Sequence, residues 1–102
     1  MVELFQFGTP ADAQRSVADR VREIRVGLGL KQTTLATRAG VTLPTLRRFE
    51  QRGEISLKHL VRICHALGRL DDFENFLIPP PEMTMAELES RAAKPRRKRG
   101  SL

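Results

Sequence analysis

Three arginines lie in residues 42–52, a segment that starts at Thr42. Arg47, Arg48 and Arg52 each carry a planar guanidinium group with several N–H donors, which suits phosphate oxygens and the O6 and N7 acceptors of guanine. Because Thr42 is a favoured residue for capping a helix, the segment is predicted to be a helix that carries these arginines. The chemistry that they indicate is the binding of an anionic partner.

The charge of the 102-residue chain, +6 in total, is divided into blocks along the sequence. Residues 1–30 are neutral, residues 31–69 carry +6, residues 70–89 carry −6 and residues 90–102 carry +6. The basic middle favours an anionic partner, whereas the acidic block would be repelled by DNA and is expected on a face turned away from it. The three charged blocks can therefore meet three different partners.

The other reactive side chains form no recognisable site. Cys64 is the single cysteine, and His59 and His65 are spaced so that they fall on different sides of a helix, so we expect neither a disulfide nor a metal site. No nucleophile lies beside a base at usable spacing, so no enzymatic activity and no cofactor are expected. The apolar runs are far shorter than the ~20 residues needed to span a bilayer, and we expect no signal peptide because Glu3 stands where one would need a basic residue. We expect a cytoplasmic protein without a membrane partner.

The elements that position the arginines are predicted to be helices. Thr9 as N-cap and Pro10 at the first helical position mark a helix start, and glycines mark its end at residues 27–29. Its predicted apolar side consists of Ala13, Val17, Val21, Ile24 and Leu28. Residues 30–41 are predicted to form a second helix that Gly40 closes, with Leu35, Ala36 and Ala39 on its buried side.

Two further helices are predicted beyond this turn, at residues 43–51 and after the N-cap Ser56. The first has Leu46 and Phe49 inward and ends at Arg52 and Gly53. The second ends at Gly68, and its predicted buried side consists of Leu57, Leu60, Val61, Ile63, Cys64 and Leu67.

The rest of the chain is divided by three prolines. A fifth helix is predicted at residues 71–77, and residues 79–81 then stop regular structure before one more short helix within residues 83–93. No segment alternates as a strand would. We therefore predict an all-α, five-helix domain at residues 9–78, preceded by an N-terminal arm (1–8) and followed by a Pro-rich, basic and flexible extension (79–102).

From Arg25 the chain reads RVGLGLKQTTLATRAGVTLPTLRRFEQRG. Across roughly residues 16–68 it resembles the Cro and lambdoid repressors of phages, called the XRE family. In that family a glutamine opens the second helix, a small alanine lies within it, a glycine makes the turn and a glutamate closes the third helix. These residues are Gln32, Ala36, Gly40 and Glu50 here. The resemblance implies a lambda-repressor-like helix-turn-helix fold and a repressor that binds a double-stranded operator as a homodimer.

The same resemblance implies roles for individual residues. It pairs Arg25 with Glu50 across the first and third helices, although both could instead be ordinary surface charges. It has Arg48 touching base edges and the exposed part of the third helix facing DNA, whereas the alternative is that Arg47 and Arg48 are merely solvated. Leu43 and Pro44 depart from family members with polar residues there and would offer only apolar contact to a thymine methyl group. The full set of implied DNA contacts is Lys31, Gln32, Thr33, Thr42, Leu43, Pro44, Thr45, Arg47, Arg48 and Arg52.

A second resemblance, to the HipB-like antitoxins, covers the chain after the third helix. Its elements are Leu67–Gly68, Asp71–Asp72, Phe76–Leu77, Pro79–Pro81, Thr84–Leu88 and Lys94–Arg99. It implies an autorepressor that also binds a HipA-type kinase toxin. A stand-alone XRE-type repressor, and an interaction module that has lost DNA binding, remain alternatives.

Both ends of the chain have more than one interpretation. Residues 1–7 are apolar and partly alternating, which fits a short strand or an arm packed on a neighbour, and either this arm or the fifth helix could supply a dimer contact. The basic tail could touch DNA, dock on a protein partner or only keep the chain soluble. Its cationic residues are Lys94, Arg96, Arg97, Lys98 and Arg99.

Overall fold

The computed structural model describes residues 8–81, 85–87 and 89–90. The described residues contain no strand, and residues 8–81 form four α-helices and a short 3-10 helix. They are α1 (Pro10–Gly27), α2 (Gln32–Ala39), α3 (Leu43–Arg52), α4 (Leu57–Ala66) and η2 (Leu70–Asn75). Residues 85–87 and 89–90 are also helical. The all-α prediction is confirmed, and residues 1–7 of the predicted arm and 91–102 of the predicted tail lie outside the described residues.

The start of α1 follows its local sequence. The Thr9 hydroxyl accepts a hydrogen bond from the Asp12 backbone N–H at 3.1 Å, and Pro10 occupies the first turn, where its missing N–H costs little. Leu28 was predicted to be buried, but it is 56% exposed because it lies past the last helical residue. The residue that the prediction missed is Ala18, which is fully buried.

The predicted second helix was two residues too long at each end. Leu30 remains in the preceding turn, because its backbone N–H donates to the Arg25 carbonyl at 3.0 Å. Gly40 ends α2 in the left-handed region, with a φ of 71°. This conformation lets the Val41 N–H return to the Ala36 carbonyl at 3.1 Å, which closes the helix and redirects the chain toward α3.

The caps of α3 and α4 are those predicted, since the side chains of Thr42 and Ser56 accept backbone N–H bonds from the third residue of each helix. Leu57 was predicted to be buried, but as the first residue of α4 it is 65% exposed. The predicted fifth helix, residues 71–77, is the 3-10 helix η2, which starts one residue earlier and ends two residues earlier than predicted. Leu77 lies beyond this helix and adopts a positive φ of 61°.

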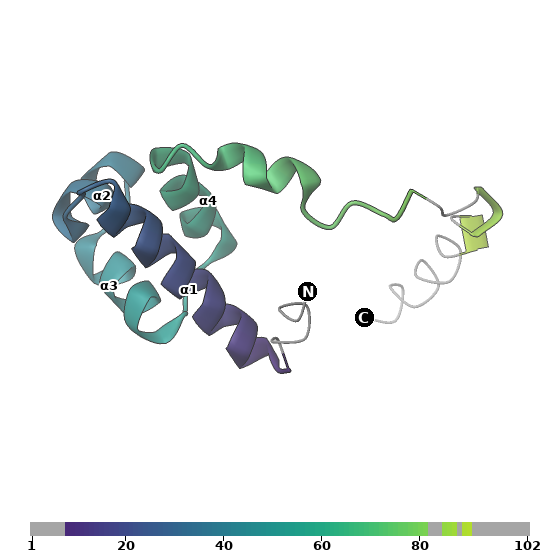
Figure 1. Cartoon of the computed structure of the whole chain (residues 1–102), viewed down its shortest axis with the longest axis horizontal. Coiled ribbons are helices and arrows are strands. Elements are labelled where there is room, and N and C mark those ends of the chain that lie inside the picture. Colours follow the sequence, from purple (N-terminus) through teal and green to yellow (C-terminus); the bar gives the residue numbers. More distant parts are fainter. Residues whose placement is uncertain (1–7, 82–84, 88, 91–102) are drawn as a thin grey trace.

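The core lies between α1, α2, α3 and α4, and its largest fully buried side chains are Leu35, Leu46, Phe49 and Ile63. α3 packs against α1 and α2, and α4 packs against α2, while the segment after η2 leads away from the bundle (Figure 1). Because α3 is covered along one side only, its other side faces outward. In the described part of the chain, no helix combines the length and the apolar character needed to cross a membrane.

Candidate nucleic-acid interface

The two sides of α3 differ sharply in burial. Leu46, Phe49 and Glu50 are buried against the other helices. Arg47 and Arg48, on the outer side, are exposed. The α-helical repeat of 3.6 residues places these two sets on opposite sides of α3. The buried side holds the helix in place, and the outer side presents guanidinium groups to solvent.

A buried ion pair joins α1 to α3. Arg25 Nε donates to Glu50 Oε2 at 2.7 Å, and Arg25 Nη2 donates to Glu50 Oε1 at 2.9 Å. Both residues are almost inaccessible, at 9% exposure for Arg25 and 6% for Glu50. Two parallel hydrogen bonds between planar groups fix orientation as well as distance. The pair therefore sets how α3 lies on α1.

Gln32, at the start of α2, belongs to the same network. Its amide Nε2 donates to Glu50 Oε1 at 2.9 Å, so the carboxylate receives three hydrogen bonds from two helices. The sequence placed Gln32 only at the DNA surface and missed this contact. Gln32 is half-buried, and the contact with DNA that the resemblance implied for it stays a prediction.

The far end of α3 is held by a second set of contacts from α1. The Arg15 guanidinium donates to the Gln51 carbonyl at 2.7 Å and also to the Glu50 carbonyl. The Gln14 amide donates to the Gly53 carbonyl at 3.1 Å. These are carbonyls at the helix end, which have no partner within the helix. Sequence reasoning missed this clamp, because nothing local marks an arginine that caps another helix.

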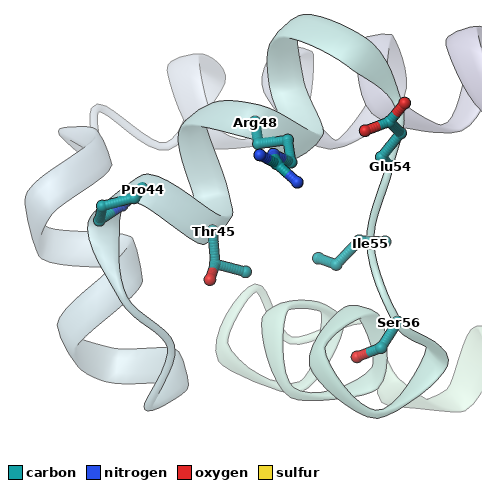
Figure 2. A pocket seen from close by; sticks show the side chains of 6 residues that line it. All are labelled: Pro44, Thr45, Arg48, Glu54, Ile55 and Ser56. Atoms are coloured by element: carbon teal, nitrogen blue, oxygen red, sulfur yellow. The ribbon is translucent and has the colours of Figure 1, made fainter.

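Arg48 borders an open hollow of about 420 Å³ between α3 and the start of α4. Figure 2 shows that Pro44, Thr45 and Arg48 line it from α3, while the chain that leads into α4 lines it with Glu54, Ile55 and Ser56. Thr45 was expected to be exposed, but it is half-buried. The hollow gives the outer face of α3 a concave region beside its arginine.

The remaining expected contacts are spread around this face. Lys31 and Thr33 are exposed at the start of α2, and Arg52 is exposed at the end of α3. Leu43 was expected to be exposed, but it is half-buried. The Thr42 hydroxyl accepts from the Thr45 N–H at 3.2 Å and lies 2.8 Å from the Thr45 hydroxyl. The five tail cations lie outside the described residues.

One acidic residue on this face was not singled out from the sequence. Residues 31–69 contain only two carboxylates, of which Glu50 is buried and paired while Glu54 is exposed beside Arg48 in the lining of the hollow. A carboxylate here opposes phosphate contacts at this point of the surface. The feature of the sequence that could have drawn attention to Glu54 is that residues 31–69 contain eight basic residues and so few acidic ones.

On α4, His65 is exposed and His59 is half-buried. Among the described residues, no group of three or more His, Cys, Asp or Glu side chains lies together in a way that could hold a metal ion.

Comparison with known proteins places this arrangement in a family. A family model described as helix-turn-helix matches residues 21–73, which are 53 of the 102 residues and include α2, α3 and the turn between them. No curated protein matches the chain at a significant level. The chain belongs to the XRE-type helix-turn-helix family of DNA-binding regulators, and its fold is the lambda-repressor-like helix-turn-helix fold.

Proposed function

We propose that this protein is a sequence-specific transcriptional repressor whose α3 enters the major groove of a double-stranded operator. The observation that carries the proposal is the outward face of α3, on which exposed arginines are held by the buried Arg25–Glu50 pair. An arginine at the position of Arg48 can donate two hydrogen bonds to O6 and N7 of guanine.

Contacts to the DNA backbone would flank this helix. Lys31 and Thr33 are exposed at the start of α2 and Arg52 at the end of α3, where they can reach phosphates on either side of the groove. Regulators of this type bind as two-fold dimers with their recognition helices roughly 34 Å apart, so we propose a homodimer on a two-fold symmetric operator. Such contacts would fix the register of α3 without reading sequence.

The proposal is tested by binding of the purified protein to the DNA upstream of its own gene. Fluorescence anisotropy with that duplex and with a scrambled duplex of the same composition separates specific from non-specific binding. We expect the specific duplex to bind at least ~10³-fold more tightly at physiological salt. Equal affinity for both duplexes would contradict a sequence-specific repressor, and no binding to either duplex would support the interaction module.

We further propose that the protein is a HipB-like antitoxin that binds a HipA-type kinase toxin. Support comes from the exposed segment after α4. Leu77 is 83% exposed and Ile78 is 57% exposed, and they follow the exposed carboxylates of Asp71 and Asp72. Apolar side chains displayed beside acidic ones suit a protein partner and repel DNA.

The antitoxin proposal is tested by co-expression with the product of the neighbouring gene, if that gene encodes a kinase-like protein. We expect the two proteins to co-purify and the double variant Leu77→Ser, Ile78→Ser to weaken the complex without changing operator affinity. A neighbourhood without such a gene, or a complex that the double variant leaves unchanged, would favour a stand-alone repressor or another docking surface.

A further inference from the structure

An open apolar groove runs between α1 and α4. It exists because α1 packs against α3 while α4 packs against α2 and η2, so the facing sides of α1 and α4 are not closed against each other. Two hollows of about 230 Å³ and 350 Å³ lie there, and Val17 and Leu60 line both. The smaller one reaches Ala13, and the larger one reaches Ile24 near the other end of α1. The two hollows therefore form one groove along α1.

Large apolar side chains in the walls of this groove are exposed to solvent. Leu57 is 65% exposed and Phe76 is 60% exposed, and both line the larger hollow. Covering such side chains removes apolar area from water and is favourable roughly in proportion to that area. A segment that fills the groove would therefore complete the core on this side.

We propose that residues 1–7 of the same chain fill this groove. Their sequence, MVELFQF, is apolar except for Glu3 and Gln6. The segment is joined to α1 at Gly8, directly before the cap residue Thr9. Ala13, which lines the near end of the groove, lies one helical turn beyond that cap, so the segment starts beside the entrance.

Length and tethering favour this occupant. From Ala13 to Ile24 the groove follows α1 for about 17 Å at 1.5 Å per residue. Seven extended residues span up to ~23 Å, enough to turn back at Gly8 and run along it. A segment tethered so closely has an effective concentration in the millimolar range, which a second copy of the chain does not reach at ordinary protein concentrations.

The few charged side chains of the groove lie in the larger hollow. They are Arg20, Arg69 and Asp72, and Arg69 is paired with Asp72 at 3.1 Å. The other residues that line this hollow are apolar, and residues 1–7 are likewise apolar except for Glu3 and Gln6. The occupant and its site are therefore matched in polarity.

The test uses Cys64, which is the single cysteine of the chain and lines the groove. The full-length variants Leu4→Cys and Phe5→Cys place a second thiol on opposite sides of an extended segment, so one of them should point toward Cys64. Both are treated with oxidised glutathione, which is reduced as the two thiols join. A disulfide forms only when the two Cβ atoms come within about 3.5–4.5 Å of each other.

We expect an intrachain disulfide in at least one of these variants, seen as a monomer on a non-reducing gel with the mass of an internal bridge. A bridge between chains would overturn the proposal in favour of arms exchanged between two copies. No bridge in either variant would overturn it too. The control Ser101→Cys places a thiol near the other end of the chain. If this thiol formed a bridge with Cys64 at the same rate, the bridges would result from random collision and the proposal would be wrong.

A second measurement does not depend on new cysteines. Burial raises the pKa of the Cys64 thiol, with Asp72 adding to the rise and Arg69 opposing it. Deleting residues 1–7 should uncover the groove and raise the alkylation rate of Cys64 by iodoacetamide severalfold at fixed pH. An unchanged rate, with helix content preserved by circular dichroism, would place the segment elsewhere. Neither measurement involves DNA, so this proposal can fail without touching the proposed repressor function.

Discussion

Individual side chains do two different jobs in this protein. Arg25 and Glu50 are buried and hydrogen-bonded to each other, so they set the orientation of α3 on α1. Arg47 and Arg48 lie on the same helix as Glu50 but are exposed, so they are free to meet a ligand. The same guanidinium group therefore holds two helices together at Arg25 on α1 and faces solvent at Arg47 and Arg48 on α3.

Replacing Arg48 separates recognition from folding. We expect Arg48→Ala to lower operator affinity by about 1–3 kcal/mol, because a bidentate contact to guanine would be lost. The thermal midpoint should stay within error, since the side chain is exposed. Anisotropy titrations measure the change, and Arg22→Ala, which removes an exposed charge from α1, is the control. Equal losses in both variants would mean that only total charge matters.

Breaking the buried pair should act on stability instead. We expect Arg25→Ala to lower the free energy of unfolding by about 3–5 kcal/mol, because it leaves the Glu50 carboxylate buried with one donor from Gln32. Urea denaturation measures the loss. The double variant Arg25→Met, Glu50→Leu should recover most of it, since apolar replacements leave no buried charge. A single variant as stable as the native protein would show that the pair is dispensable.

The sequence predicted these side-chain roles unevenly. The Arg25–Glu50 pair was expected from resemblance, whereas the bonds from Gln32 to Glu50 and from Arg15 to the end of α3 were not. Both missed contacts join residues more than fifteen positions apart and depend on how whole helices pack. Pattern and propensity carry no information about such distances.

At the scale of the helices, capping residues predicted the helix starts better than apolar periodicity predicted the buried faces. Thr9, Thr42 and Ser56 cap the helices that they were expected to cap. Leu28 and Leu57 were expected in the core because apolar periodicity was continued to the helix ends. At an end there is no neighbouring helix to cover the side chain, so periodicity overstates burial there.

The contact between the end of α3 and the start of α1 gives a prediction about Gly53. Its φ is +73°, and an added Cβ would lie 3.1 Å from the backbone of Gln14. We expect Gly53→Ala to lose about 1–2 kcal/mol of stability from backbone strain and a further loss from this close contact. Gly29→Ala is a matched control, because its φ is also +73° and nothing lies within 4 Å of its Cβ.

Equilibrium unfolding of both alanine variants measures the difference. Gly53→Ala should be the less stable, because only there does backbone from another helix have to move. Equal losses at both glycines would mean that α1 and α3 separate readily at this point.

For the molecule as a whole, the order of helices was enough to predict the all-α class, and the helix-turn-helix fold followed from the resemblance. The groove between α1 and α4 was not foreseen. It arises from which helices pair with which, and residues such as Val17 and Leu60 look like ordinary core positions in the sequence.

The charge blocks make a prediction about the tail. We expect deletion of residues 94–102 to make the salt dependence of DNA binding shallower, because each phosphate contact releases condensed counterions. The slope of log affinity against log salt concentration measures the number of such contacts, with the native protein as control. An unchanged slope would assign the tail to a protein partner or to solubility.

The most direct test of α3 as the recognition helix is methylation protection of guanine N7 on the operator, with the native protein and with Arg48→Ala. We expect the native protein to protect guanines in two major-groove segments one helical turn, roughly 34 Å, apart. Arg48→Ala should lose protection at one guanine in each segment while keeping the rest. No protection of guanine N7 by the native protein, or protection that is unchanged in Arg48→Ala, would contradict the placement of α3 against the bases.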